Sequence, residues 1–239
     1  MHSKEVAIIV AGGKGLRLPG DIPKQFIEIC GLPVLMHTVI AFRSYSASLE
    51  IILVLPAGDI PLWNELCLKH SFTEKITVVS GGSSRFHSVS NGLNQTSGPG
   101  LVAVHDGVRP LVTADIIASS FSIAKKCRSA VASVLLKESI REVESPLSAK
   151  EPATLQEMRS VSLDRTKFRL MQTPQTFDIA LLKGAYDKAL GDSFTDDASV
   201  VESTGDTITL FDGSYENIKI TTPEDLIVAE AIMRSRKQK

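Results

Sequence analysis

The sequence has no long hydrophobic run, and no stretch approaches the ~18 consecutive apolar residues that a membrane-spanning helix needs. The N-terminal residues enter the first expected strand within a few residues of Met1. We therefore expect a soluble, cytoplasmic protein with no membrane partner.

Cysteine is scarce, with only three residues in the chain: Cys30, Cys67 and Cys127. They are widely spaced and include no Cys-x-x-Cys pair, which argues against both a disulfide framework and a zinc knuckle. We expect them to be small core residues in a reducing compartment.

The chain also lacks an excess of either charge, because its 26 basic and 27 acidic residues leave a formal net charge of -1. Without an overall basic field, a nucleic-acid partner is not indicated, and any anion site must be local. No linker rich in proline, glycine or serine divides the 239 residues. We expect a single domain over residues 1–239.

The most informative stretch is a buried apolar strand that runs directly into glycines. Val6–Val10 is β-branched and apolar, and Gly12, Gly13 and Gly15 follow it. Glycines let backbone N–H groups approach an anion closely, and Arg17 and Lys24 add two cations. The combination suits a polyphosphate; the alternative is a glycine-rich turn with two solvated cations.

Two common nucleotide motifs do not fit this stretch. It lacks the Walker A pattern, and Leu18 stands where the dinucleotide fingerprint needs a third glycine or alanine. Pro19, Gly20 and Pro23 prevent a helix from starting there. We expect an irregular flap that carries Arg17 and Lys24 over the ligand.

Downstream, apolar runs typical of buried strands alternate with segments of helical periodicity, which predicts an α/β fold with a largely parallel sheet. The expected strands are Val6–Val10, Ile51–Leu55, Ile76–Val79, Leu101–Val104, Ala130–Leu136, Thr207–Phe211 and Asn217–Ile220. The expected helices are Val34–Phe42, Asp59–His70, Ser83–Thr96, one from Thr113 to Cys127, Ile179–Leu190, Asp196–Ser203 with Thr195 as its cap, and one from Pro223.

Polar residues follow the strands at the sheet's carboxyl edge, where ligands of open α/β sheets bind. They are Arg17, Lys24, Arg85, Ser88, Asp106, Arg109 and Lys219. Asp106 and Arg109 could instead form a local ion pair that closes a turn. We expect His105 to be a packed histidine rather than a catalyst, and the histidines show no metal-ligand spacing.

Eight short motifs, in order along the chain, resemble those of the 2-C-methyl-D-erythritol 4-phosphate cytidylyltransferases of the non-mevalonate isoprenoid pathway. Each motif is weak alone, but the ordered set covers nearly the whole chain. The motifs are Ala11–Arg17, Pro23–Gln25, Gly81–Val89, His105–Pro110, Asp164–Arg165, Thr173–Gln175, Thr195–Ser199 and Asn217–Lys219.

The resemblance implies CMP transfer from CTP to methylerythritol phosphate, with release of pyrophosphate and with Mg²⁺ held mainly by the CTP phosphates. It implies nucleotide binding by Ala11, Gly12, Gly13, Gly15, Gly82, Ser83, Ser88 and Gly107. It implies that Arg17 and Lys24 hold phosphates and stabilise the transition state. It places Asp106, Thr173, Thr195 and Lys219 on the acceptor side, with Lys219 also near the α-phosphate.

The resemblance also gives meaning to a charged stretch with few apolar anchors, at about residues 137–161, which we call the arm. In the family the matching segment projects from a single Rossmann-like nucleotidyltransferase domain with a mixed, largely parallel sheet. There it clasps a second subunit, and the residue matching Arg165 reaches the acceptor phosphate in the partner's site. A homodimer with shared sites is therefore expected.

Three alternatives stay open at the level of sequence. Ala11–Gly13 and the Gly107-Val108 pair lean slightly towards ribitol 5-phosphate cytidylyltransferases, although Lys137–Glu142 resembles the methylerythritol family better. A nucleotide-binding regulatory domain without catalysis is a second reading, which the presence of Arg17, Lys24, Asp106 and Lys219 opposes. A dehydrogenase is a third, and the missing third glycine opposes it.

Overall fold

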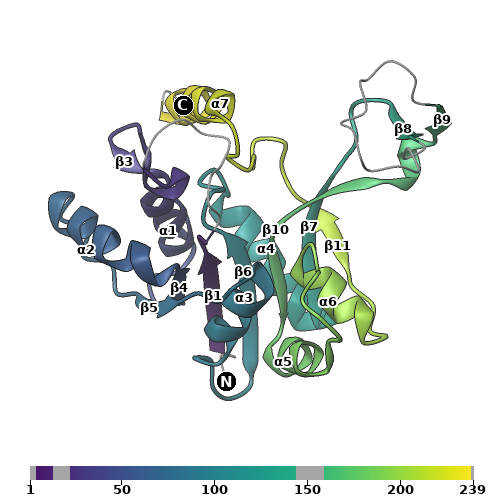
Figure 1. Ribbon diagram of the computed structural model, residues 1–239, viewed down its shortest axis with the longest axis horizontal. Helices are drawn as coiled ribbons and strands as arrows, with labels where there is room; N and C mark the ends of the chain where they lie inside the picture. The colour runs from purple at the N-terminus through teal and green to yellow at the C-terminus, as the bar shows by residue number, and fades with distance from the viewer. Residues whose placement is uncertain (1–3, 13–21, 144–158, 238–239) are drawn as a thin grey trace, which may run out of the picture.

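The computed structural model describes residues 4–12, 22–143 and 159–237, and a seven-stranded sheet forms its centre (Figure 1). The strands stand in the order β11-β7-β10-β6-β1-β4-β5. Their bounds are Lys4–Val10 (β1), Glu50–Leu55 (β4), Thr77–Ser80 (β5), Gly100–Asp106 (β6), Ser129–Leu135 (β7), Arg169–Asp178 (β10) and Leu210–Asp212 (β11). The predicted mixed, largely parallel sheet is confirmed.

All neighbouring strands run parallel except β10, which pairs antiparallel with both β6 and β7. In the register of β1 and β6, Val10 lies opposite Asp106. Leu55 of β4 lies opposite Ser80 of β5. The loops after these four strands therefore leave the sheet at one edge, as the sequence predicts for a ligand site.

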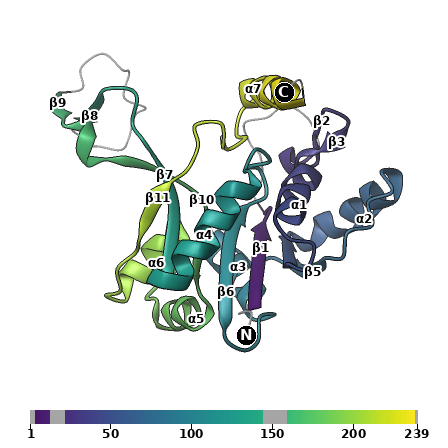
Figure 2. The same ribbon diagram turned by 180° about the vertical axis from the view of Figure 1, so that it is seen from behind.

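Helices cover both faces of the sheet (Figures 1 and 2). The helices are Val34–Tyr45 (α1), Ile60–Lys69 (α2), Arg85–Leu93 (α3), Ala114–Cys127 (α4), Ile179–Lys188 (α5), Asp197–Ser203 (α6) and Pro223–Lys237 (α7). Short 3-10 turns occur at Lys24–Phe26 (η1), Ala57–Asp59 (η2) and Arg165–Lys167 (η3).

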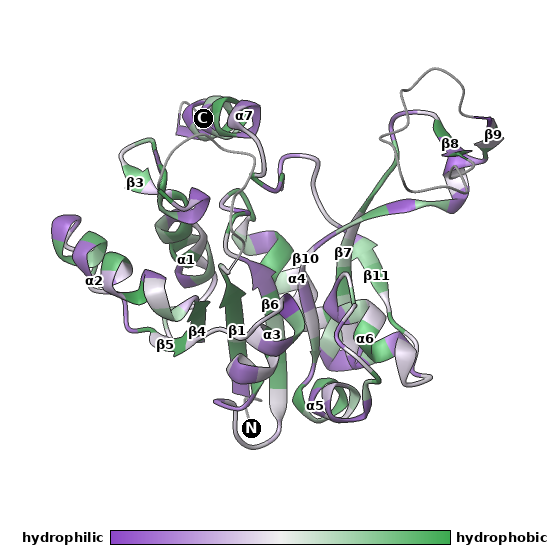
Figure 3. Cartoon of the chain, viewed as in Figure 1, coloured by the Kyte–Doolittle hydropathy of each residue, from purple (hydrophilic) through white to green (hydrophobic). Residues whose placement is uncertain are grey.

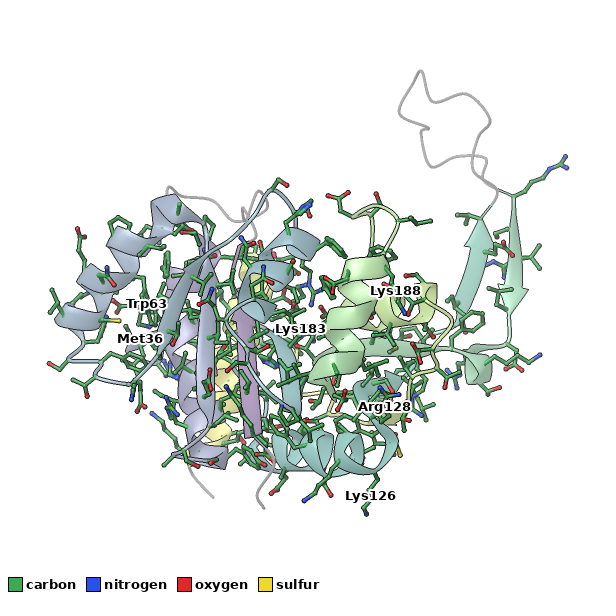
Figure 4. All side chains as sticks on the ribbon, turned by 90° about the horizontal axis from the view of Figure 1, so that it is seen from below. Met36, Trp63, Lys126, Arg128, Lys183 and Lys188 are labelled. Carbon is green, nitrogen blue, oxygen red and sulfur yellow. The ribbon has the colours of Figure 1, made fainter. Side chains whose placement is uncertain are left out.

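Alternate residues of β1 enter two separate cores, because successive side chains of a strand point to opposite faces. Ala7 and Ile9 join the core under α1, α2 and α4, whereas Val6 and Ile8 join the core under α3, α5 and α6. Figure 3 shows β1 and β4 among the most hydrophobic parts of the chain. In Figure 4, Met36 and the buried Trp63 are labelled on the side of the first core.

Polar caps are found where the sequence predicts several helices to begin. The Thr113 hydroxyl accepts from the Ile116 N–H at the start of α4. The Asp225 carboxylate accepts from the N–H of Thr222 at the start of α7. One prediction is wrong: the cap of α6 is Asp196, whose carboxylate forms a capping box with Ser199.

The last helix lies over a third, smaller core. Ala229 of α7 is buried there with Ile29, Val108 and Ile220. Ile29 ends the first strand of a small hairpin, Glu28–Ile29 (β2) and Leu32–Pro33 (β3), which turns through Cys30 and Gly31 at positive φ. The expected strand at 217–220 does not form. Its backbone bonds other partners: Asn217 O accepts from the Arg109 side chain, and Ile220 N donates to Val108 O.

The arm projects from the body, as Figures 1 and 2 show. Its described part is a hairpin of Ile140–Val143 (β8) and Ser160–Leu163 (β9). Val143 and Val161 are more than half exposed on it. The hairpin thus has little apolar contact with its own domain.

The cysteine prediction is partly wrong. All three thiols are free, but Cys30 and Cys67 are only half-buried and Cys127 is exposed. Cys127 is the last residue of α4, where the chain leaves the core. In the three described ranges, no helix is both long and apolar enough to cross a bilayer.

Candidate active site

The loops that leave the carboxyl edge of the sheet enclose a pocket of about 320 Å³. Contributions come from the ends of β1 and β6, from η1, from the loop after β5 and from the segment before α7. The lining residues are Val10, Ala11, Gly12, Lys24, Gln25, Pro56, Gly81, Gly82, Ser83, Ser84, Arg85, Ser88, Asp106, Val108 and Lys219. We call this the large pocket.

A close approach of α3 shapes the glycine loop on one side of the large pocket. The Ser88 hydroxyl accepts from the Gly82 N–H at 3.1 Å and donates to the Ser84 carbonyl at 2.9 Å. A Cβ on Gly82 would lie only 2.3 Å from the Cβ of His87. Only glycine fits at this position, which leaves the backbone of the loop open to a ligand.

A second pocket of about 200 Å³ adjoins the large pocket. The two share three lining residues, Arg85, Asp106 and Lys219. The remaining residues that line this small pocket are Arg109, Met171, Gln172, Thr173, Gln175, Thr195 and Asp196. A ligand in one pocket would therefore meet a ligand in the other across the shared wall.

The shared wall is an ion cluster centred on Asp106. Lys219 Nζ lies 3.1 Å from Asp106 Oδ2, Arg109 Nε lies 3.2 Å from the same oxygen, and Arg85 Nε lies 3.8 Å from Oδ1. Burial would raise the pKa of Asp106, but Lys219, Arg85 and Arg109 outweigh it and hold that pKa well below its usual range. Asp106 is therefore an ionised carboxylate at neutral pH and, with its pKa lowered in this way, a weak general base.

Cations outnumber carboxylates around the large pocket. Among the described residues Lys24, Arg85 and Lys219 line it, and Asp106 is the carboxylate that opposes them. Such an excess suits a polyphosphate, for which the backbone N–H groups of Gly12 and Gly82 provide further donors.

The small pocket is held in shape by side chains that bond its backbone. The Thr173 hydroxyl accepts from the Asp106 N–H at 3.1 Å. The fully buried Asn217 donates to the Thr173 carbonyl at 2.8 Å. Arg109 donates to the Asn217 carbonyl at 2.8 Å. These bonds tie β6 and β10 to the segment that carries Lys219.

His105 takes no part in either pocket, as predicted. Its ring is fully buried, lies edge-on to Phe42 and bonds the Arg109 carbonyl through Nε2 at 3.2 Å. Burial lowers the pKa of His105 to about 4. The ring is therefore neutral at pH 7 and serves to pack and hold the turn at Arg109.

Most of the predicted site residues meet at these two pockets. Ala11, Gly12, Lys24, Gly82, Ser83, Ser88, Asp106 and Lys219 line the large pocket, and Thr173, Thr195, Asp106 and Lys219 line the small one. The alternative of a local Asp106–Arg109 ion pair is also real, but it forms only part of the larger cluster. Gly13, Gly15 and Arg17 lie outside the described residues.

Two predicted residues line neither pocket in the described parts of the chain. Gly107 instead packs closely, since a Cβ there would lie 2.8 Å from the Ala11 Cβ. Arg165 lies on η3 beside the arm, where it donates to the Lys137 carbonyl. Arg85, Gln175 and Asp196 also line the pockets, although no sequence pattern predicts a specific role for them.

The described residues contain no group of three histidine, cysteine or acidic side chains that could hold a metal by itself. Asp106 is the single carboxylate on the described lining of the large pocket. Mg²⁺ commonly binds through one carboxylate and the substrate's phosphates while keeping several waters. The described lining therefore fits a metal that enters with a nucleotide.

Comparison with known proteins gives consistent matches over nearly the whole chain. The sequence model of IspD, 2-C-methyl-D-erythritol 4-phosphate cytidylyltransferase, matches residues 5–235. A protein of that name from Bacteroides thetaiotaomicron is 46% identical over 230 residues, which cover 96% of this chain and 100% of the relative. One from Phocaeicola vulgatus is 45% identical over 226 residues, or 95% of this chain and 98% of the relative.

Solved structures agree. The 4-diphosphocytidyl-2C-methyl-D-erythritol synthase of Anaerococcus prevotii superposes with a TM-score of 0.79 at 29% identity, covering 97% of this chain and 96% of that one. The 2-C-methyl-D-erythritol 4-phosphate cytidylyltransferase of Thermus thermophilus gives a TM-score of 0.74 at 31% identity, covering 96% and 99%. By sequence and by structure, the chain belongs to the 2-C-methyl-D-erythritol 4-phosphate cytidylyltransferase family.

Proposed function

We propose that the protein transfers CMP from CTP to 2-C-methyl-D-erythritol 4-phosphate, giving 4-diphosphocytidyl-2-C-methyl-D-erythritol and pyrophosphate. The observation that carries the proposal is the wall of Arg85, Asp106 and Lys219 shared by the two pockets. CTP occupies the large pocket and the acceptor occupies the small one, so that the two phosphates meet beside Lys219.

The reaction is an in-line displacement. A phosphate oxygen of the acceptor forms a bond to the α-phosphorus of CTP, and the bond from that phosphorus to the bridging oxygen breaks as pyrophosphate leaves. The attacking phosphate is already an anion, so no side chain has to remove a proton. Catalysis then depends on positioning and charge neutralisation, which fits a site that is rich in cations and whose one shared carboxylate stays ionised.

Each group of pocket residues has a proposed task. Ala11, Gly12, Gly82, Ser83 and Ser88 bind the nucleotide, and backbone and hydroxyl groups of the glycine loop distinguish the amino group of cytosine from the carbonyl of uracil. Lys24 and Lys219 neutralise charge at the phosphates, and Thr173 and Thr195 bind the acceptor. For Arg17, Gly13, Gly15 and Gly107, the proposed phosphate and nucleotide contacts rest on the family resemblance.

We also propose a requirement for Mg²⁺, which neutralises phosphate charge when bound with CTP. Among the described residues of the large pocket, Asp106 is the carboxylate available to it. The expected result is that EDTA abolishes turnover and that added Mg²⁺ restores it.

We further propose a homodimer with shared sites, working in the cytoplasm. The projecting arm with its exposed Val143 and Val161, and the position of Arg165 away from both pockets, support it. Mixing inactive Arg165→Ala and Lys24→Ala subunits should restore activity if Arg165 serves the partner's site, because mixed dimers contain one intact site. An active monomer in sedimentation would overturn the shared site, and cell fractionation tests the location.

One assay tests the activity: pyrophosphate release from CTP with methylerythritol phosphate or with ribitol 5-phosphate as acceptor. We expect much higher kcat/KM for methylerythritol phosphate, the acceptor that the names of the relatives also favour. Preference for ribitol 5-phosphate would assign the other cytidylyltransferase activity. CTP binding without pyrophosphate release from either acceptor would support the regulatory reading, and a change in NAD(P)H fluorescence on binding would support the dehydrogenase reading.

A further inference from the structure

Behind the shared wall lies a buried carboxylate that lines neither pocket. Asp197, the first residue of α6, is fully buried. Its Oδ2 accepts from Arg85 Nη2 at 2.6 Å, and its Oδ1 accepts from the Tyr186 hydroxyl at 2.7 Å. Both carboxylate oxygens are therefore committed to two side chains from other helices, α3 and α5.

A buried ion pair of this kind is weak evidence for stability, because the cost of burying two charges roughly cancels their attraction. A pair of apolar side chains would hold α3 against α6 equally well. The charge of Asp197 instead affects its partner, because Arg85 is one of the three residues that both pockets share.

Arg85 stands between two carboxylates at unequal distances. It is 2.6 Å from Asp197 and 3.8 Å from Asp106. Burial would lower the pKa of Arg85, but Asp197 and Asp106 raise it above its usual value, so the guanidinium stays charged. Arg85 approaches Asp106 at Oδ1, whereas Lys219 and Arg109 contact Oδ2.

The hydroxyl of Tyr186 completes the arrangement. Its pKa is raised by burial and by Asp197, so it stays protonated and keeps donating. Its ring stacks on Phe86, the neighbour of Arg85, with centroids 4.5 Å apart. Tyr186 thus holds Asp197 through its hydroxyl, and its ring packs against the residue next to Arg85 in α3.

Resting on the proposed function, we propose that Asp197, supported by Tyr186, is a positioning residue. It fixes the Arg85 guanidinium in the wall between the nucleotide and acceptor pockets. There the guanidinium faces the phosphate group of the acceptor. Without the negative charge of Asp197, Arg85 turns towards Asp106 and competes with Lys219, so the acceptor phosphate is misplaced while CTP still binds.

The test compares Asp197→Asn, which keeps the shape of the side chain, with Tyr186→Phe, which keeps the ring. For Asp197→Asn we expect kcat/KM for the acceptor to fall by about 100-fold, as a misplacement of about 1 Å can cause. The Kd for CTP, measured by calorimetry, should change little. Tyr186→Phe should show a smaller loss in the same direction. Glu50→Gln, which removes the partner of Lys4 at the opposite end of the sheet, should leave both values unchanged.

A double-mutant cycle separates positioning from folding. If Asp197 acts through Arg85, then Asp197→Asn should add little further loss in an Arg85→Met background, and the double variant contains no unpaired buried charge. If the losses in kcat/KM of the two single variants multiply in the double variant, the proposal is wrong. It is also wrong if the Kd for CTP rises by the same factor as the KM for the acceptor. Thermal unfolding of each variant verifies that the compared proteins are folded.

A second readout does not depend on turnover. In protein labelled with ¹⁵N-arginine, Arg85 should give a protected guanidinium signal, assigned by its loss in Arg85→Met. We expect Asp197→Asn to abolish that protection, and an unchanged signal would refute the positioning role. If the wild-type protein releases no pyrophosphate from either acceptor, the proposed function fails, whereas the Arg85 signal still tests the inference.

Discussion

Lys219 Nζ lies 3.1 Å from Asp106 Oδ2, at the border of the two pockets. Lys219 remains 42% exposed, whereas the Asp106 side chain is 11% exposed. The amine can therefore move to a phosphate while Arg85 and Arg109 keep Asp106 paired. A phosphate bound at this border would exchange one anionic partner of Lys219 for another, which would limit the cost of moving the charge.

The first prediction concerns Asp106. Asp106→Asn should lower kcat by about 100-fold, since the cations around it lose the carboxylate that orients them. In the absence of Mg²⁺, CTP should bind at least as tightly as to the wild type, because the pocket becomes more positive. Turnover assays and calorimetry provide the two measurements. Asp115→Asn, at an exposed position on α4, is the control, and equal weakening of CTP binding would contradict the prediction.

The second prediction concerns Lys24, which lines the large pocket from η1. Lys24→Ala should reduce kcat by about 100-fold or more while the Kd for CTP changes much less, if the amine acts mainly on the transition state. Lys69→Ala removes an exposed lysine that pairs with Glu28 and should be neutral. Equal losses in kcat and in CTP affinity would rule out a transition-state role.

The third prediction concerns the glycine loop. In Gly82→Ala the new methyl group would collide with His87 and push the loop away from α3, so CTP affinity should fall. Gly184→Ala is a matched control, because Gly184 lies in α5 with no atom near the added methyl group. It should leave CTP affinity unchanged and raise the free energy of unfolding by about 0.5–1 kcal/mol. Unchanged CTP affinity in Gly82→Ala would show that the loop does not form the nucleotide wall.

The fourth prediction is a pH dependence of stability. His105 has a pKa of about 4 in the folded protein and 6.5 as its ordinary value, so the unfolded state binds its proton first as the pH falls. The stability that this pKa difference contributes is complete above pH 6.5 and is lost as the pH falls from 6.5 to about 4.

Denaturant unfolding between pH 7.5 and 4.5 measures this loss. The control is His105→Gln, whose amide can still donate to the Arg109 carbonyl. As the pH falls, the free energy of unfolding of the wild type should decrease more steeply than that of the variant, by up to about 1.4 kcal/mol per pH unit. The pKa of His37 is also lowered by burial, so the difference between the two proteins is the relevant quantity. Parallel pH profiles would exclude His105 as the cause.

Local sequence patterns were enough to predict the framework of this protein. The apolar run Val6–Val10, the strand that ends before Gly81 and the starts of α4 and α7 each depend on a few neighbouring residues, and the structure confirms all of them. Because the carboxyl ends of parallel strands share one edge, the same patterns also brought Gly12, Gly82 and Asp106 to one site.

The tertiary structure alone decided the contacts between residues far apart in the chain. Arg85 and Asp197 are separated by 112 positions, and no periodicity signals that one buried carboxylate bonds both Arg85 and Tyr186. The segment Asn217–Ile220 reads as a strand, but side-chain and loop partners take its hydrogen bonds and place Lys219 against Asp106. Periodicity records which face of an element is buried, whereas the partner across that face depends on how all the elements pack.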